Sequence, residues 1–370
     1  MTIVRNLDVA AAHREIRTEL SAALDRVMES GWFVLGEEVR GFESRWADYV
    51  GTSACVGVAN GMEALQLALH AMDVGRGDEV VVPSNTYVAT WLAVTNVGAT
   101  PVPVEPLETT YNIDPDRVAA AITSRTRALI PVHLYGQPAD MDPLIAIAEQ
   151  HGLEVLEDAA QVHGGRYKGR RAGSLGRAAA WSFYPSKNLG ALGDAGAVTT
   201  SDARLAGRIQ RLRNYGASAK YVNEETGFNS RLDEMQAAVL VTKLGVLDEW
   251  NDRRRRVAAR YRQAFSATQL VLPDAPDWAM PVWHLFVVRT PHRDGLRKHL
   301  GDRDIETAIH YPIPPHLQRA YEHLGYGPGS FPVAEAIHRE VLSLPMGPHL
   351  TGSQVDQVIE AVLSFPPLCG

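Results

Sequence analysis

The chain has 370 residues, a hydrophobic content of 45% and a formal net charge of -7. Such a chain can bury a large core as two unequal domains or as one large α/β domain. Its charge provides no basic field that would attract nucleic acid, and no run approaches the roughly 18 apolar residues that a membrane helix needs.

The N-terminal residues and the two cysteines indicate the cellular compartment in which the protein is expected. Asp8 and His13 precede any apolar stretch long enough for a secretion signal. Cys55 and Cys369 are too few for a disulfide framework and lack the spacing of metal ligands. We therefore expect a cytoplasmic protein with free thiols, no metal site and no membrane contact.

From about residue 54 to residue 200, short β-branched runs alternate with helical patterns, which predicts a mostly parallel seven-stranded sheet. Several of the runs are apolar throughout, as expected when helices cover both faces of a sheet. The helical pattern at 62–72 places Leu65, Ala68, Leu69 and Met72 on one face, which is predicted to pack on the sheet. The predicted strands are ACVGVAN (54–60), DEVVVPS (78–84), TPVPVE (100–105), RALIPVH (127–133), LEVLEDA (153–159), AAAWSFYP (178–185) and GAVTT (196–200).

After Arg231 the pattern changes to two long helices, 232–250 and 251–265, followed by a smaller mixed region whose clearest strand is PVWHLFVVRT (281–290). We predict a domain boundary near Trp250, with a large α/β domain at 1–250 and a smaller C-terminal α+β domain at 251–370. The basic run Arg253 to Arg256 is interpreted as a solvated helix face.

Ligands of open α/β sheets bind at the carboxyl ends of strands, so polar residues just past those ends are candidates for a site. At Asn60-Gly61-Met62 a strand ends and a helix begins, which suits a phosphate. A plain helix cap at Asn60 explains the same residues. Tyr87 follows the next strand and is placed to stack on a planar ring, although a single aromatic there is usually part of the core.

Three further places carry charge or a capping pattern. Asp158, with Gln161, follows an apolar strand, where a carboxylate is costly to bury unless a cation such as a protonated pyridine nitrogen pairs with it. Lys187 lies in SFYPSKNLGALGDAGAVTT (182–200), whose small residues allow a close backbone approach. Asn229, Ser230 and Arg231 are predicted to open a helix.

Taken in order, NGMEAL, the strand-end Tyr87, EDAAQVHG, SFYPSKNLGALGDAGA and GFNSRLDEMQAA resemble the DegT/DnrJ/EryC1/StrS sugar aminotransferases over nearly the whole chain. The resemblance implies the pyridoxal 5'-phosphate (PLP)-dependent transferase fold type I, which is like that of aspartate aminotransferase. The lysine loop resembles the branch that acts on 3-keto sugar nucleotides, because 4-keto enzymes more often show FH where Phe183-Tyr184 stand.

The resemblance also implies roles for single residues. Lys187 would bind PLP covalently as an imine, Asp158 would pair with the pyridinium nitrogen, and Gln161 would hydrogen-bond the ring hydroxyl. Tyr87 would stack on the ring. The remaining implied contacts are to the phosphate, through the backbone of Gly61 and Met62, the Ser182 hydroxyl and, from the neighbouring subunit, Asn229. The family commonly has a hydroxyl residue where Met62 stands, so that side-chain contact is lost here.

The implied reaction moves an amino group from an amino acid, by analogy glutamate, to a nucleotide-linked keto sugar, with pyridoxamine 5'-phosphate as intermediate and Lys187 as proton shuttle. Such an enzyme would be a homodimer with shared active sites and would supply amino sugars for antibiotics or cell-surface glycans. The candidates for sugar contacts are Tyr184, His310, Tyr311 and Lys220.

Three alternatives stay open. An aminotransferase of the same family acting on a 4-keto sugar or a keto-cyclitol is separable only by substrate. A 3-dehydratase of the family would carry His in place of Lys187. A non-catalytic PLP-binding regulator or a nucleotide-binding module would need a DNA-binding segment or a GxGxxG after the first strand, and the first strand ends in VANGMEA.

Overall fold

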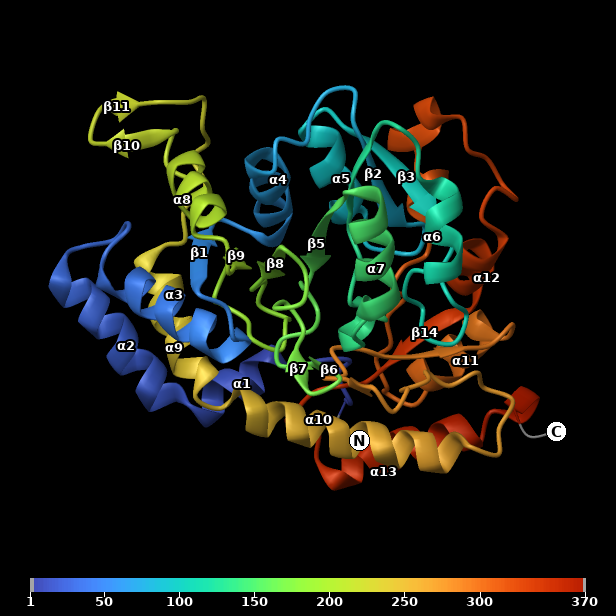
Figure 1. Ribbon diagram of the computed structural model, residues 1–370. Helices are drawn as coiled ribbons and strands as arrows, with labels where there is room; N and C mark the ends of the chain where they lie inside the picture. The colour runs from blue at the N-terminus through green and yellow to red at the C-terminus, as the bar shows by residue number, and fades with distance from the viewer. Residues whose placement is uncertain (1–2, 369–370) are drawn as a thin grey trace.

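The computed structural model describes residues 3–368 and is built around one seven-stranded sheet (Figure 1). All seven predicted strands are confirmed, in the spatial order β1-β9-β8-β5-β4-β2-β3. The pairs among β3, β2, β4, β5 and β8 are parallel, whereas β9 runs antiparallel to both of its neighbours. The strands are β1 (Ala54–Val58), β2 (Glu79–Pro83), β3 (Thr100–Val104), β4 (Thr126–Leu129), β5 (Glu154–Asp158), β8 (Ala178–Ser182) and β9 (Gly196–Thr200).

Helices cover both faces of the sheet. Alternate residues of each strand point to opposite sides, and in strands such as β2 and β9 the residues on both sides are buried. In β8, Ala178 and Ala180 join the core with α4, α5 and α8, whereas Ala179 and Trp181 join the core with α3 and α9. A third core lies between the β2–β5 part of the sheet and α6 and α7. These helices are α3 (Glu37–Val50), α4 (Gly61–Ala71), α5 (Val88–Asn96), α6 (Pro115–Ala121), α7 (Met141–His151), α8 (Ala203–Leu212) and α9 (Glu234–Leu244). The predicted face of Leu65, Ala68, Leu69 and Met72 is buried in the first of these cores.

A separate core is formed by C-terminal elements and by Val4 from the start of the chain. Val4 forms a bridge to Ile305, so the first described residues lie against this C-terminal core. Helix α10 runs along the base of the molecule and supplies Val257, Tyr261 and Phe265 (Figure 1). The C-terminal elements are α10 (Leu247–Phe265), β13 (Phe286–Arg289), α11 (Arg293–Gly301), α12 (Pro332–Glu340), β14 (Val341–Leu344) and α13 (Gly352–Leu363). A division near residue 250 remains our proposal.

The remaining elements are short or peripheral. The hairpin of β10 and β11 projects from the body beyond α8 (Figure 1). They are α1 (Val9–Glu15), α2 (Arg17–Ser30), β6 (Arg166–Tyr167), β7 (Arg170–Arg171), β10 (Ala217–Ala219), β11 (Val222–Asn223) and β12 (Ala279–Met280), with 3-10 turns at Leu134–Gly136, Pro315–Leu317, Arg319–Leu324 and Pro366–Leu368. Between residues 3 and 368, the structure has no helix long and apolar enough to cross a membrane. Cys55 is buried as a free thiol, and Cys369 lies outside the described residues.

Three expectations about the second half of the chain are wrong. Helix α9 begins at Glu234 with Asp233 as its cap, so Asn229, Ser230 and Arg231 precede it in extended backbone instead of opening it. The break between the two long helices falls at 245–246, before Trp250. Only Phe286–Arg289 of the predicted strand 281–290 pairs as a strand.

The basic run is not a uniform solvated face. Arg254 is only 3% exposed, because its side chain points from α10 into the interior of the protein. There its Nη1 donates to the carbonyls of Trp283, His284 and Met346. Arg253 and Arg255 make ion pairs at the surface with Glu15 and Asp252. The prediction of a solvated face is correct for Arg253, Arg255 and Arg256 and wrong for Arg254. A helix turns about 100° per residue, so consecutive side chains point in different directions.

Candidate active site

The carboxyl ends of the parallel strands open into a cavity of about 540 Å³. Most of the residues singled out by the sequence lie in its wall, although they come from segments up to 250 residues apart in the chain. The predicted residues that line it are Gly61, Met62, Tyr87, Asp158, Gln161, Ser182, Tyr184, Lys187, His310 and Tyr311.

One end of the cavity is the N-terminus of α4. Asn60 caps this helix by accepting from the Glu63 amide at 2.9 Å. The amides of Gly61 and Met62, in the first turn, have no carbonyl one turn earlier in the helix to bond, and the helix end is electropositive. A Cβ on Gly61 would lie 2.5 Å from the Cβ of Ser182. The missing side chain therefore brings two amides and the Ser182 hydroxyl together, as an anion-binding cradle requires.

The opposite part of the wall carries the Asp158 carboxylate at the end of β5. It is 6% exposed, and it accepts from Thr90 Oγ1 at 2.8 Å and from the Ala160 amide at 3.2 Å. Burial raises the pKa of Asp158 above its ordinary value, while the bond from Thr90, the Ala160 amide and the charge of Lys187 oppose that rise. A cationic group facing this carboxylate would favour its charged form.

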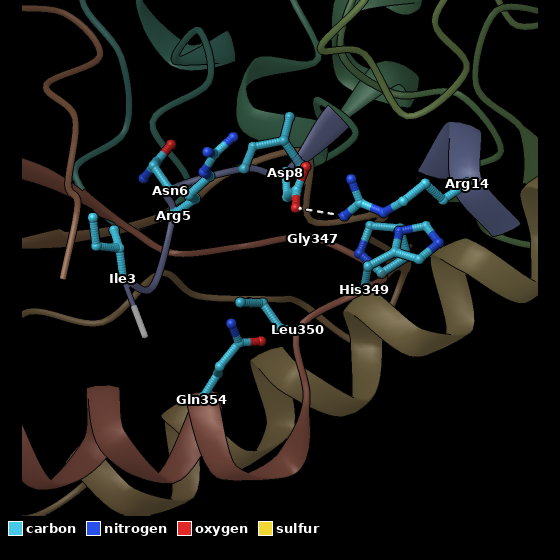
Figure 2. A pocket seen from close by; sticks show the side chains of 11 residues that line it. Ile3, Arg5, Asn6, Asp8, Arg14, Gly347, His349, Leu350 and Gln354 are labelled. Atoms are coloured by element: carbon cyan, nitrogen blue, oxygen red, sulfur yellow. Dashed lines mark hydrogen bonds and ion pairs between the residues drawn. The ribbon is translucent and has the colours of Figure 1, made fainter. Parts of the chain in front are cut away.

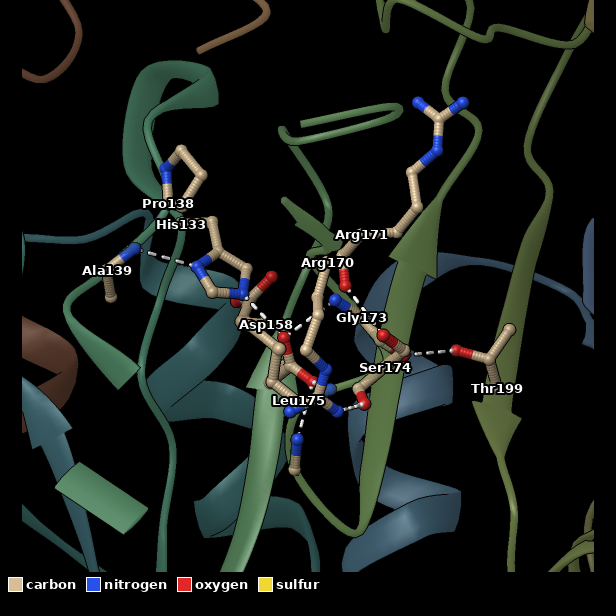
Figure 3. A network of polar contacts seen from close by, with 12 residues as sticks. His133, Pro138, Ala139, Asp158, Arg170, Arg171, Gly173, Ser174, Leu175 and Thr199 are labelled. Atoms are coloured by element: carbon tan, nitrogen blue, oxygen red, sulfur yellow. Dashed lines mark hydrogen bonds and ion pairs between the residues drawn. The ribbon is translucent and has the colours of Figure 1, made fainter. Parts of the chain in front are cut away.

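The residue before Asp158, Glu157, anchors β5 through a polar network that includes His133, Gly173 and Leu175, which Figure 3 shows around the strand. Both Glu157 and His133 are fully buried, with 2.9 Å between His133 Nε2 and Glu157 Oε2. Nδ1 of His133 accepts from the Ala139 amide at 3.0 Å, so Nε2 carries the proton that is donated to Glu157. Amides of the 173–176 loop supply three more hydrogen bonds to the carboxylate, from Gly173, Leu175 and Gly176.

This network fixes the charge of Glu157. Burial by itself would raise the pKa of the carboxyl, but His133 and the amides of the 173–176 loop hold it below its ordinary value. Because the next residue is Asp158, whose amide and carbonyl also pair with 131–133, the network immobilises the backbone that carries the site carboxylate.

Lys187 lies in the loop that follows β8. The loop turns back at once, since the Lys187 amide donates to the Tyr184 carbonyl at 2.8 Å and the Ala191 amide donates to the Phe183 carbonyl at 2.8 Å. Burial lowers the pKa of Lys187 to about 8, and Asp158 opposes that change. At pH 7 roughly a tenth of this amine is therefore neutral, far more than for an ordinary lysine, and a nucleophile or base requires the neutral form.

A further part of the cavity wall is formed by Gln161, Tyr311 and Tyr87. Gln161 accepts from the Tyr135 amide at 2.6 Å and donates from Nε2 to the Tyr311 hydroxyl at 3.1 Å. The rings of Tyr87 and Tyr311 have centroids 5.1 Å apart, and Tyr87 is 52% exposed. His310 Nδ1 lies 2.8 Å from the Ser343 hydroxyl, and burial lowers the pKa of His310 to about 4.

Two predicted residues lie elsewhere in this chain. Asn229 is exposed and pairs with Asn214 in extended backbone next to α8, and Lys220 is exposed in the turn between β10 and β11, with its Nζ 5.2 Å from the Tyr221 ring centroid. Neither is part of the lining of the cavity.

Sequence reasoning missed Thr90 and His284. Thr90 lies one turn after Tyr87 on α5, so a search at i+3 from the strand-end aromatic would have found it. His284 reaches the cavity from the C-terminal part of the chain, with its Nδ1 3.3 Å from Asn188 Oδ1. Nothing in its local sequence marks it, because the contact joins residues 96 apart.

The wall fits pyridoxal phosphate on its own chemistry. The Gly61 cradle suits the phosphate, the buried Asp158 suits a protonated ring nitrogen, and the Lys187 amine suits the aldehyde. Gln161 Nε2 donates one hydrogen to Tyr311, and its second hydrogen, which has no acceptor among residues 3–368, suits a ring hydroxyl.

Comparison with known proteins shows the family of this chain. The model of the DegT/DnrJ/EryC1/StrS aminotransferase family matches residues 14–363. The dTDP-3-amino-3,4,6-trideoxy-alpha-D-glucose transaminase of Streptomyces venezuelae is 56% identical over 358 residues, which cover 96% of this chain and 94% of that protein. The dTDP-3-amino-3,6-dideoxy-alpha-D-galactopyranose transaminase of Aneurinibacillus thermoaerophilus is 52% identical over 356 residues, covering 96% and 98%. The crystal structure of S. venezuelae DesV in complex with a ketimine intermediate superposes with a TM-score of 0.96 at 55% identity and covers 98% of both chains.

Proposed function

The chain belongs to the DegT/DnrJ/EryC1/StrS aminotransferase family, and from this premise we propose that it transfers an amino group from glutamate to C3 of a dTDP-linked 3-keto-6-deoxyhexose. It is a PLP-dependent sugar aminotransferase of fold type I. The product would be an amino sugar for an antibiotic or a cell-surface glycan, made in the cytoplasm.

The observation that carries the proposal is the convergence of Lys187, Asp158 and the Gly61 cradle on one cavity. An amine with a pKa of about 8 and a buried carboxylate interact across that space. A nucleotide-binding module has no need for a lysine whose pKa is tuned toward neutrality.

Bound pyridoxal phosphate supplies a ring that withdraws electrons from the carbon attached to the migrating nitrogen. Lys187 would hold the cofactor through Nζ, and the neutral Nζ, once free, would accept the α-proton of the amino acid and supply a proton to the sugar carbon. The Asp158 carboxylate keeps a proton on the ring nitrogen, and Thr90 keeps the carboxylate charged and oriented. The amides of Gly61 and Met62 and the Ser182 hydroxyl bind the phosphate.

The choice of C3 and of dTDP rests on the two relatives, which are named for dTDP-3-amino sugars and exceed 50% identity to this chain. The lysine loop supports it, because Phe183 is buried in the aromatic cluster while Tyr184 is 55% exposed and lines the cavity. The residue that differs in the FH form of 4-keto enzymes therefore faces the substrate space. We assign the sugar contacts to Tyr184, His310 and Tyr311.

We propose that two chains share each active site. Asn229 is exposed just after the hairpin in the chain, and Lys220 is exposed in the turn of the hairpin, where Tyr221 is 89% exposed. Large apolar side chains are also exposed at Trp32 and Phe33. A second copy covering this surface would bury the apolar side chains, and Asn229 of one subunit would meet the phosphate in the cavity of the other. Lys220 would approach the nucleotide pyrophosphate in the same way.

Mixed dimers test the shared site. Lys187→Ala dimers should be inactive and Asn229→Ala dimers weakly active. A mixture refolded or co-expressed from the two variants should regain activity, because one of its two sites then has both residues intact. Activity in the mixture no higher than the mean of the two pure variants would show that Asn229 serves its own chain or none.

The substrate is tested by incubating the enzyme with glutamate and matched dTDP-3-keto and dTDP-4-keto 6-deoxyhexoses, followed by identification of the amino product by mass spectrometry and NMR. We expect amination at C3 and release of 2-oxoglutarate. Preferred turnover of the 4-keto sugar or of a keto-cyclitol would favour the alternative within the family, and no turnover with a dimer that binds PLP would refute the proposed substrates.

A further inference from the structure

A second, smaller cavity of about 30 Å³ lies behind the Lys187 loop. It is bounded by 185–190 of that loop, by α9 and α10, and by the segment that precedes α1. A cavity of this size holds one water or one ion of similar volume.

This cavity adjoins the surface. It shares Leu7, Asp8, Pro348 and His349 with a cavity of about 470 Å³ on the outside of the N-terminal segment. Figure 2 shows this outer cavity, with Arg5 and Arg14 on the N-terminal segment and His349 facing them. The small cavity therefore lies next to a larger cavity at the surface.

Two buried cations line the small cavity without a carboxylate partner. Lys243 is 2% exposed, and its Nζ donates to the Gly190 carbonyl at 2.5 Å and lies 3.0 Å from His13 Nε2. Arg254 is 3% exposed, and within residues 3–368 its hydrogen bonds all leave from Nη1 to carbonyl oxygens. One hydrogen of Lys243 and the Nε and Nη2 groups of Arg254 thus have no acceptor among the described residues.

The acidic groups nearby are already engaged. Among the described residues that line the cavity, Asp8 is the one with a carboxylate. This carboxylate accepts from the Ala11 amide and from Arg14, both at 3.0 Å. Burial of charge without a counter-charge is costly. That cost is visible in the pKa values, since burial lowers the pKa of Lys243 to about 8 and that of Arg254 to about 10.

We propose that this cavity binds a small monovalent inorganic anion, such as chloride, between Lys243 and Arg254. The anion accepts the unused hydrogens of both side chains and neutralises part of their charge. Lys243 also donates to the Gly190 carbonyl, so an anion bound to Lys243 stabilises the turn at Gly190. This turn belongs to the loop that carries Lys187, which the anion therefore supports from behind.

The test measures stability, so its result does not depend on the sugar that the enzyme uses. Thermal unfolding of the purified holoenzyme is compared in chloride and in gluconate at equal ionic strength. We expect a saturable rise of the midpoint in chloride, of about 2 °C when the anion is at roughly ten times its Kd. A crystal soaked in bromide should show an anomalous peak beside Lys243 and Arg254.

Substitutions locate the effect. Arg254→Met and Lys243→Met should each remove the difference between chloride and gluconate, whereas Arg256→Met, at an exposed position of the same helix, should retain it. Equal midpoints of the wild-type enzyme in the two salts, or a bromide-soaked crystal with no peak in the cavity, would overturn the proposal and leave a water there. The wild-type comparison and the crystal decide the matter even if a variant fails to fold.

Discussion

Replacing Thr90 by valine tests how the protein keeps Asp158 charged. Valine has nearly the same shape, but it removes the 2.8 Å hydrogen bond from Oγ1 to Asp158 Oδ2 and leaves the Ala160 amide as the remaining donor among the described residues. A hydrogen bond to a charged group contributes about 1.5–3 kcal/mol. If that energy acts on the charged carboxylate in the transition state, kcat/KM falls by about 10- to 100-fold.

The pH profile separates this role from a loss of packing. The hydrogen bond from Thr90 lowers the pKa of Asp158 against the effect of burial, so its removal raises that pKa. The acid limb of kcat/KM should then move to higher pH in Thr90→Val. Thr86→Val is the matched control, since Thr86 Oγ1 lies 2.9 Å from Thr90 Oγ1 and makes no bond to Asp158. An unchanged acid limb with unchanged kcat/KM in Thr90→Val would refute the argument.

Three further results are expected. Glu157→Gln should lower the free energy of unfolding in urea by about 3 kcal/mol, because an amide cannot accept from His133 and three backbone amides at once; an unchanged urea midpoint would contradict the anchoring role. Gly61→Ala should weaken PLP binding measured by equilibrium dialysis, since its Cβ would lie 2.5 Å from Ser182 Cβ, whereas Gly207→Ala, with no atom within 4 Å, should not. In the apoprotein, an amine-directed reagent should label Lys187 with a midpoint near pH 8, because the neutral amine reacts and burial lowers its pKa to about 8; a midpoint above pH 10 would show that the amine is solvated.

The strands were predictable because their signal is local. Runs such as VVVP in β2 and AAAW in β8 are apolar on both faces, and only a sheet covered on both sides accommodates that composition. The strand-end positions of Gly61, Asp158 and Ser182 follow from the same pattern, since a parallel sheet brings its carboxyl ends to one edge.

Helix boundaries in the second half were harder to predict, since an apolar stripe passes through 232–265 with little interruption. The residues that interrupt it, at 245–246, are Gly and Val, which also occur inside helices. The inward direction of Arg254 was hidden for a related reason. Four consecutive arginines look alike in sequence, and only the packing of α10 decides which one faces the interior.

The sequence by itself singled out Lys187 and Asp158, because each follows a predicted strand whose signal is local, and the chemistry expected of them was implied by the family resemblance. The tertiary structure alone decided what surrounds them: Thr90 on the carboxylate, His284 in the cavity wall, and Lys243 and Arg254 behind the loop. The bonds from Thr90 to Asp158 and from Lys243 to Gly190 join residues 68 and 53 positions apart, and the contact between His284 and Asn188 joins residues 96 apart. Local periodicity holds no information about such pairs, since they are set by how the helices pack on the sheet and not by the order of neighbouring residues.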